Sequence, residues 1–287
     1  MLRGVDAPRI PALIISGRVT ARRRPTLASD VELCYDARGE VLAYCSATHG
    51  TLRVDMPGVA EFRLEPGADA VIAAPHGSVT RDLLVETFQH CVLPLMLPAL
   101  GIEALHASAV AGEAGVVAFC GASGVGKSTI AVALSRQGRL LCADDAVAID
   151  VASSVPHVVP IPFTSRLRPE SARLLGAVDA EPRRTAPEIS GRLPLAAVCL
   201  LRRAPDASVA VAIDRLDAAT ASSGMLAHAY CFSVRDAARK RRTVGNYLTL
   251  ATRVAVYEAR FRPGPAAFPA ILGALDEIVD GVVARTR

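Results

Sequence analysis

Short apolar runs separated by turn residues fill the first quarter of the chain. Each run has four or five residues and is bounded by dipeptides typical of turns, among them His49-Gly50, Pro57-Gly58 and Pro66-Gly67. Runs of this length with such boundaries indicate strands joined by tight turns. The pattern predicts a small antiparallel β-rich domain over residues 1–77, with strands at 12–15, 31–35, 41–45, 51–54, 61–64 and 70–73.

The next stretch, residues 78–100, changes to a helical period. Its apolar positions recur every three or four residues, and Ser78 or Thr80 can cap the start. We expect a helix here that connects the β-rich domain to a second domain, so that the second domain covers residues 78–287. The most apolar part, residues 91–100, is short and contains Pro94 and Pro98, so we expect no membrane span.

The rest of the chain mixes apolar strand-like runs with amphipathic helical segments, which is typical of an α/β domain. The runs at 105–110 and 115–120 can pair as a hairpin, and a short helix at 129–137 leads to a further run at 140–143. Beyond these, strands are predicted at 195–201, 209–213 and 254–261, and helices at 169–175, 216–231, 234–250 and 268–283.

A glycine-rich loop stands between the run at 115–120 and the helix at 129–137. Its order fits the phosphate-binding pattern G-x-x-x-x-G-K-[ST]. Glycines let backbone N–H groups wrap around phosphate oxygens, and the start of the helix adds positive potential. We expect ATP with Mg²⁺ here, Lys127 reaching the β- and γ-phosphates and Ser128 ligating the metal. The predicted nucleotide-binding residues are Gly121, Ala122, Ser123, Gly124, Val125, Gly126, Lys127, Ser128 and Thr129.

Two adjacent carboxylates, Asp144 and Asp145, end the apolar run at 140–143. A strand ending in an acid is typical of the second half of a phosphate-loop site, where a carboxylate holds Mg²⁺. Successive side chains point in different directions, so Asp144 can serve the metal while Asp145 takes a proton from the acceptor. A plain acidic turn is the alternative. His106 is ambiguous, because a lone histidine between apolar residues is more often a core side chain, unless the hairpin brings it to the phosphates.

Composition narrows the classes of partner. A net charge of +4 over 287 residues does not indicate nucleic acid or a membrane surface. The basic run at 235–242 has no interleaved aromatic residues, which argues against single-stranded nucleic acid. Seven scattered cysteines without a CxxC pair favour reduced thiols over disulfides or a zinc site, and therefore a cytoplasmic protein.

His106, the loop at 121–128 and the pair Asp144-Asp145 together resemble the catalytic domain of HPr kinase/phosphorylase, the bacterial P-loop serine kinase. The resemblance implies an α/β P-loop kinase core of the HPr kinase/PEP carboxykinase type with a small β-rich N-terminal domain. It also implies ATP and Mg²⁺ as cofactors and, by family precedent, a homo-oligomer. By position, Asp145 would accept the proton of the target serine, and His106 would lie beside the phosphoryl centre.

The sequence departs from that family at Thr164, where a glutamate is expected two residues before the phosphate-facing arginine, Arg166. Glu170 or Asp144 would have to replace that acid, so the forward transfer is expected and the reverse phosphorylase reaction is not. The layout is more similar to shorter relatives, some of which phosphorylate the C-terminal serine of lasso-peptide precursors. A polar segment at 179–191 follows, and its neighbouring arginines (183, 184 and 192) either clamp phosphate or an acidic substrate, or are solvated.

We therefore predict a kinase that moves the γ-phosphoryl group of ATP to a serine hydroxyl of a peptide or protein. Its catalytic residues would be Asp145, His106, Lys127 and Arg166, and its metal ligands would be Ser128 and Asp144. Two alternatives remain open: a small-molecule kinase, and a nucleotide-dependent regulatory or binding protein without transfer activity.

Overall fold

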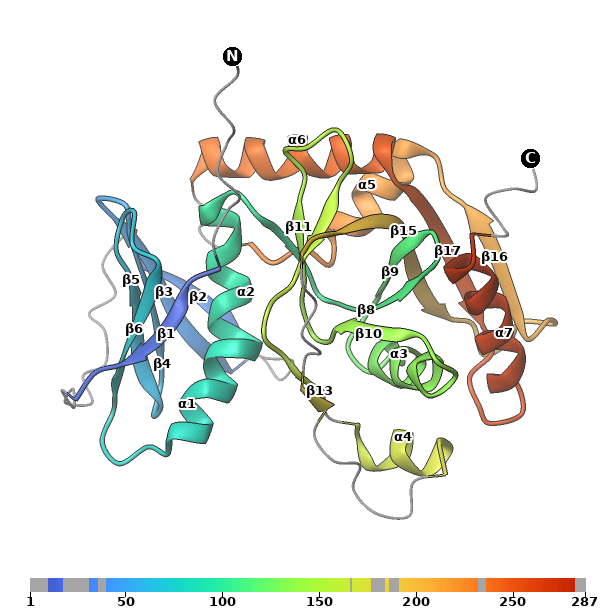
Figure 1. The fold of residues 1–287 in the computed structure, drawn as a ribbon, viewed down its shortest axis with the longest axis horizontal. Helices are drawn as coiled ribbons and strands as arrows, with labels where there is room; N and C mark the ends of the chain where they lie inside the picture. Colours follow the sequence, from blue (N-terminus) through green and yellow to red (C-terminus); the bar gives the residue numbers. More distant parts are fainter. Residues whose placement is uncertain are drawn as a thin grey trace. The chain divides into compact units, whose positions relative to one another are not determined.

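The computed structural model describes residues 10–17, 31–35, 40–165, 167–176, 184–185, 191–231 and 236–281 (Figure 1). The chain divides into two compact units. The first comprises Met1–Gly101 with Cys231–Arg241, and the second comprises Ile102–Tyr230 with Arg242–Arg287. Both strands and helices build the chain around two main sheets, so the predicted α/β class is confirmed. The helical residues after position 78, predicted to connect to the second domain, group by their contacts with the first unit.

A six-stranded sheet forms the first unit, and all the strands predicted there are present among the described residues. Its order is β1 (Ala12–Ile15), β6 (Ala70–Pro75), β5 (Ala60–Leu64), β4 (Thr51–Met56), β3 (Val41–Thr48) and β2 (Val31–Tyr35). The neighbours β2 to β6 pair antiparallel, as the turn signals predict. The prediction of a wholly antiparallel sheet was wrong for β1, which runs parallel to β6. Turns specify pairs of successive strands, whereas a parallel pairing is made over a long stretch of chain.

Four consecutive helical segments follow the sheet: α1 (Arg81–Thr87), the π-helical turn η1 (Phe88–Val92), α2 (Leu93–Met96) and the 3₁₀ turn η2 (Leu97–Leu100). Thr80 caps the first, because its hydroxyl accepts a hydrogen bond from the Leu83 N–H at 3.3 Å. The prolines at 94 and 98 lack an N–H, which accounts for the changes of helical type. The predicted helix is therefore present but irregular.

By length and composition alone, the stretch Arg81–Leu100 is long and apolar enough to cross a membrane, with 20 residues and a mean hydropathy of 1.4. Its apolar stripe, however, is buried within the first unit, and Phe88 stacks on Phe62 of β5 at 6.5 Å between ring centroids. A core helix has the same composition as a short membrane helix. The segment therefore does not by itself indicate a membrane span.

The sheet of the second unit is built around three parallel strands, β9 (Gly115–Cys120), β15 (Leu193–Arg203) and β17 (Ala255–Phe261). The predicted hairpin is confirmed, because β8 (Ala107–Gly112) pairs antiparallel with β9. The remaining strands are β10 (Leu140–Ala143) beside β8, β16 (Val211–Arg215) beside β17, and β12 (His157–Val159), β11 (Val147–Asp150) and β7 (Glu103–Leu105) beyond β15. A separate two-stranded ribbon joins β13 (Thr164–Ser165) to β14 (Arg184–Thr185).

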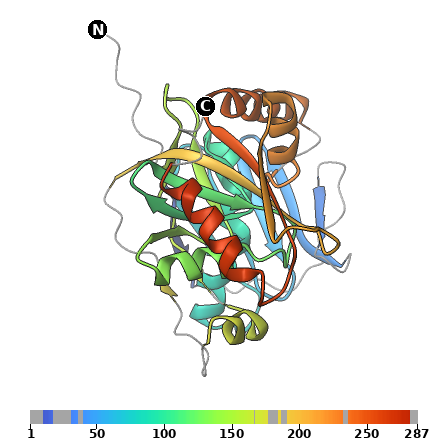
Figure 2. The same cartoon turned by 90° about the vertical axis from the view of Figure 1, so that its right-hand side faces the viewer.

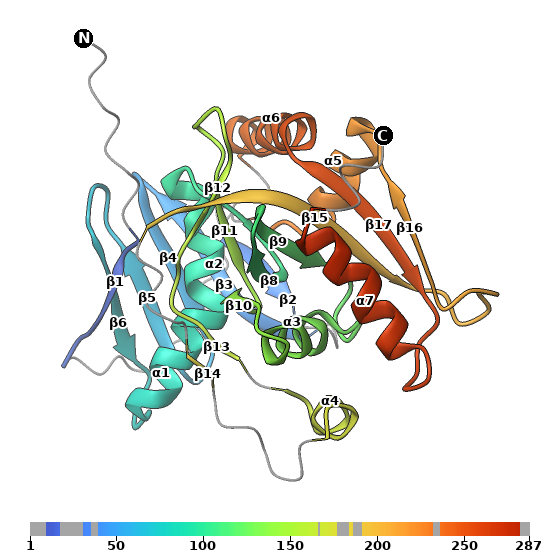
Figure 3. The ribbon, with the colours of Figure 1, turned by 45° about the vertical axis from the view of Figure 1, so that its right-hand side comes forward.

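Helices cover both faces of this sheet (Figures 2 and 3). Successive residues of β9 point to opposite faces, so Val117 and Phe119 join one core and Val116 and Ala118 join the other. The first core includes α3 (Lys127–Arg136) and α7 (Phe268–Val279), and the second includes α5 (Ala218–Leu226) and the later part of α6 (Ala237–Arg253). A short helix, α4 (Pro169–Leu174), follows the ribbon. This packing fixes the loop between β9 and α3.

Candidate active site

The phosphate loop connects β9, which is buried along its whole length, to the first turn of α3. Gly121, Gly124 and Gly126 have φ angles of 153°, 78° and 119°, which only glycine adopts readily. A Cβ atom at Gly121 would also lie 2.8 Å from the Leu201 carbonyl oxygen of β15. The glycines of the motif are therefore required by the backbone path. That path delivers the loop amides to the start of a helix, where anions bind.

Lys127 is 6% exposed and folds back across the loop. Its ammonium donates hydrogen bonds to the carbonyl oxygens of Gly121 at 2.9 Å and Ala122 at 3.3 Å. Burial lowers the pKa of this amine, and the nearby Asp144 and Asp145 act in the opposite direction. The positive group is thus held among the loop amides, in reach of any phosphate that they bind.

The Asp144 carboxylate is a hub that ties the loop to three other segments. It is 4% exposed, and its oxygens accept hydrogen bonds from Ser128 on α3 at 2.7 Å, Ser108 on β8 at 2.6 Å and Ser165 on β13 at 2.6 Å. The Asp145 N–H also donates to it at 3.1 Å. Because hydrogen bonds to a carboxylate are strong, this network fixes the orientation of the side chain beside the loop.

Asp145 has a φ of 65°, in the left-handed region that non-glycine residues seldom occupy. Its carbonyl oxygen accepts hydrogen bonds from His106 Nδ1 at 3.0 Å and from the Tyr230 hydroxyl at 3.1 Å. A carbonyl has no proton to give, so Nδ1 is the donor in this contact, and the same nitrogen lies 3.2 Å from the Tyr230 hydroxyl. Two donors on one carbonyl hold the backbone in this turn, and the Asp145 side chain is half-buried.

His106 lies between β7 and β8. The pairing of β8 with β9 brings it to the candidate site, beside Asp145, so it is not a plain core side chain. Burial lowers the pKa of its imidazole, and the positive charge of Lys127 lowers it further. Its ring meets that of Tyr230 edge to face, with centroids 6.0 Å apart. Burial and the charge of Lys127 both favour the neutral form of the imidazole, while Asp145 and Asp144 act in the opposite direction.

Two residues of the site, His228 and Tyr230, were not found from the sequence. The predicted helix at 216–231 was too long: α5 ends at Leu226, and the chain then returns to β7, where the Tyr230 N–H donates to Ala104 O at 2.9 Å. The His228 carbonyl accepts from the His106 N–H at 2.7 Å. Burial lowers the pKa of His228, and Lys127 and His106 act in the same direction.

Ser128 and Asp144 offer hydroxyl and carboxylate oxygens, the donors that Mg²⁺ prefers. Among the described residues there is no cluster of three or more His, Cys, Asp or Glu side chains that could hold a metal by itself. A magnesium ion bound through one or two carboxylates and the phosphates of a nucleotide needs no such cluster. The residues present therefore fit Mg²⁺ delivered with a nucleotide.

The other predicted positions give mixed results. Arg166 and Arg183 lie outside the described residues, as does the side chain of Arg184. Thr164 is half-buried on β13, and its neighbour Ser165, rather than an acid, contacts Asp144. Glu170 is exposed on α4. Arg192 forms an ion pair with the buried Asp150 at the end of β11. Its charge is therefore already paired within the protein.

Comparison with known proteins finds no matching family model and no matching curated protein. Among solved structures, the chain is similar to the Hpr(Ser) kinase/phosphatase from Coxiella burnetii. The two share 11% identity with a TM-score of 0.34, over 61% of this chain and 96% of the other. Similarity at this level says nothing about reaction or substrate.

Proposed function

We propose that this chain is an ATP-dependent kinase that phosphorylates a serine hydroxyl of a peptide or protein. One observation carries the proposal: the hydrogen bond of 2.7 Å from Ser128 to Asp144 joins a complete phosphate loop to a strand that ends in two carboxylates. Phosphoryl transfer by P-loop enzymes needs a phosphate cradle, a metal site and a group that orients or deprotonates the nucleophile. The chain has residues for each of these roles within its second unit.

The nucleotide phosphates bind on the loop amides and at the first turn of α3. Lys127 exchanges its two carbonyl partners for oxygens of the β- and γ-phosphates, which are stronger acceptors because they are charged. Ser128 and Asp144 would hold Mg²⁺, which when bound would neutralise charge on the phosphates.

The acceptor approaches from the side of Asp145. The Asp145 carboxylate takes the proton of the serine hydroxyl as the serine oxygen bonds to the γ-phosphorus. The bond from that phosphorus to the bridging oxygen breaks, and ADP leaves with the electron pair. His106 and Tyr230 hold the Asp145 backbone, so they position the base rather than touch the acceptor. Arg166 orients the γ-phosphate in this proposal on the strength of its place in the sequence alone.

We also propose a class of acceptor. The resemblance of its motif layout to kinases of peptide precursors supports a small peptide, such as a lasso-peptide precursor with a C-terminal serine, in the cytoplasm. The reaction proposed is the forward one, since no acid stands at position 164.

Acceptor-dependent formation of ADP tests the proposal. Purified protein is incubated with Mg-ATP, with and without a serine-containing peptide, and ADP is measured. We expect peptide-dependent ADP from the wild-type chain and at least about 100-fold less from Lys127→Ala or Asp145→Asn. The exposed pair Lys240→Ala and Asp206→Asn serve as matched controls and keep the wild-type rate. Unchanged rates in Lys127→Ala and Asp145→Asn would sink the proposal.

A further inference from the structure

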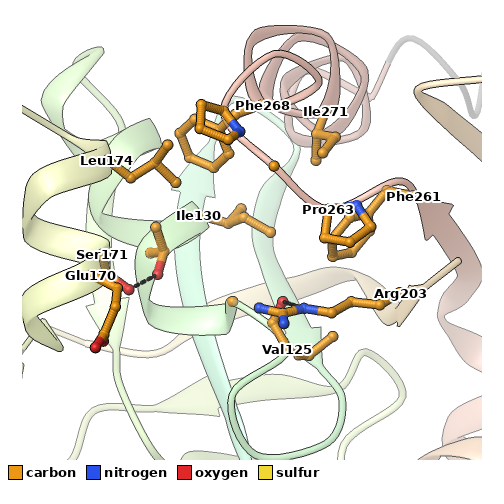
Figure 4. A pocket seen from close by; sticks show the side chains of 14 residues that line it. Val125, Ile130, Glu170, Ser171, Leu174, Arg203, Phe261, Pro263, Phe268 and Ile271 are labelled. Carbon is orange, nitrogen blue, oxygen red and sulfur yellow. Dashed lines mark hydrogen bonds between the residues drawn. The ribbon is translucent and has the colours of Figure 1, made fainter. Parts of the chain in front are cut away.

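A cavity of about 270 Å³ opens beside the phosphate loop, on the flank that the proposed reaction does not use (Figure 4). The loop contributes Val125 and Gly126 to its wall, and the first turn of α3 contributes Thr129. The opposite wall comes from Phe261 at the end of β17 and from Phe268 at the start of α7. A ligand on the loop amides would therefore border this cavity directly.

The cavity lies where the three parallel strands end. The loop follows β9, Arg203 is the last residue of β15, and Phe261 is the last residue of β17. In open sheets with parallel strands, ligands bind at the carboxyl ends of the strands. The cavity therefore belongs by position to the same ligand as the loop.

The strand order shows which part of the ligand the cavity faces. The order β10, β8, β9, β15, with β17 beside β15, places Asp145 after β10 on one side of the loop strand. The cavity lies at the ends of β15 and β17, on the other side. The γ-phosphate meets its acceptor at Asp145, so the opposite flank faces the end of the nucleotide that leaves with ADP.

The lining is chemically suited to a flat heteroaromatic ring. Apolar faces of Ile130, Leu174, Phe261 and Phe268 surround the cavity, and Figure 4 shows Leu174 and Phe268 at the same end of it. Aromatic and aliphatic faces bind bases by stacking, whatever their hydrogen-bonding edge. The volume is slightly below the range of about 300–1,000 Å³ for whole drug-sized ligands, which suits one base with part of its sugar.

The polar side chains of the lining are Arg203 beside the loop, Thr129 on α3, and Ser171 with the exposed Glu170 on α4. Thr129 donates a hydrogen bond to Ser171 at 2.7 Å, and the Arg203 Nε donates to the Val125 carbonyl at 3.4 Å. Arg203 is exposed, so its guanidinium lies at the junction between the loop and the cavity with its charge available to a phosphate or a sugar. Apart from the exposed Glu170, the lining thus changes from charged at the loop to apolar in the cavity, in the order of a nucleotide from phosphate to base.

We propose that this cavity is the nucleoside subsite, which holds the base of the triphosphate whose phosphates lie on the loop. This inference rests on the proposed function, which puts the phosphates on the loop and the γ-phosphate beside Asp145; the binding test below needs no phosphoryl transfer. The base lies between the Ile130 and Phe268 sides, and Arg203 contacts the sugar–phosphate junction.

The test compares ATP with inorganic tripolyphosphate, which has the phosphates and lacks the nucleoside. Binding of each to the full chain is measured by calorimetry with Mg²⁺ present. Leu174→Trp fills the cavity from a side chain that is 37% exposed, and Phe268→Ala removes one wall. Leu248→Trp, on the 47% exposed Leu248 of α6, is the matched control. Should Phe268→Ala fail to fold, Leu174→Trp still gives the answer.

We expect the wild-type chain to bind ATP at least about tenfold more tightly than tripolyphosphate, the effect of one base–aromatic stack. Leu174→Trp and Phe268→Ala lose about tenfold for ATP and nothing for tripolyphosphate, while Leu248→Trp loses nothing for either. Equal wild-type affinity for the two probes, or an equal loss for both in the cavity variants, overturns the subsite. Binding of neither probe overturns the phosphate site as well. Selective loss of ATP binding without any phosphorylated peptide would uphold the subsite and contradict the kinase.

Discussion

The Ser128 hydroxyl donates a hydrogen bond to the Asp144 carboxylate at 2.7 Å, which links the helix after the phosphate loop to the end of β10. Ser108 and Ser165 bind the same carboxylate from β8 and β13, so four segments meet at one buried acid. The next residue, Asp145, leaves this cluster through a left-handed turn. The two adjacent aspartates therefore have different surroundings, and we propose different roles for them.

Substitution of each aspartate separates the two roles. Asp144→Asn removes a charged metal ligand, so we expect weaker binding of ATP in Mg²⁺ and little change for ATP in EDTA. Asp145→Asn keeps the binding of Mg-ATP and lowers transfer by about 10²–10⁴-fold, the usual contribution of a general base. Calorimetry and a transfer assay on both variants check this. Identical effects of the two substitutions would contradict the division of roles.

Lys127→Ala removes the cation that is buried within the loop. We expect about 10²–10³-fold slower transfer, as for loss of one preorganised donor in a low-dielectric site, together with weaker binding of ATP. In the folded chain the substitution removes hydrogen bonds to two carbonyls of the loop. Kinetics alongside thermal unfolding distinguish the two effects. If Lys127→Ala instead yields only unfolded, insoluble protein, the role of Lys127 is structural and the prediction is wrong.

Ser108→Ala deletes a buried donor to the Asp144 carboxylate at 2.6 Å. A hydrogen bond to a charged group contributes about 1.5–3 kcal/mol, so the free energy of unfolding should fall by about that amount. Chemical denaturation measures it, with the exposed Ser223→Ala of α5 as the matched control. A loss below about 0.5 kcal/mol, the range of surface substitutions, would show that the network adds no stability.

Stability should depend on pH through His106. Burial, and then the charge of Lys127, lowers the pKa of His106 in the folded chain below the value of about 6.5 for an unfolded one. Below about pH 6.5 the unfolded chain therefore binds a proton that the folded chain does not, and stability falls as pH falls. Above that pH the contribution is complete. His228 acts with the same sign.

Denaturation at pH 7.5 and pH 5.5 measures this effect. His106→Gln should show a smaller loss of stability on acidification than the wild-type chain, and His49→Asn, at an exposed turn, should show the same loss as the wild type. An unchanged pH dependence in His106→Gln would indicate that other groups control it.

The parts of the site that are local in sequence were predictable. The backbone of the loop at 121–128 needs glycine at positions of positive φ, and Asp144 and Asp145 directly follow a strand. A role for His106 in the site could be predicted only together with the pairing of β8 and β9, which the turn between two apolar runs suggested. These features depend on neighbours that the chain itself places close together.

The rest depends on contacts between distant segments. Tyr230 reaches the site because its N–H binds Ala104, and nothing in the apolar period of residues 216–231 marks the end of α5 at Leu226. Ser108 and Ser165 belong to no motif and matter only through Asp144. The strands β7 and β11 to β14 have two to four residues, too few for a period of two to be recognised.

The central claim is that this site phosphorylates a serine hydroxyl, and mass spectrometry of peptide products tests it most directly. Peptides with a C-terminal or an internal serine, each matched by a peptide with alanine at that position, are incubated with the wild-type chain and Mg-ATP. The account predicts a gain of one phosphate on serine peptides of at least one kind, none on alanine peptides, and none with Asp145→Asn. Tight binding of Mg-ATP without a phosphate on any serine peptide, or equal phosphorylation by Asp145→Asn, would contradict it.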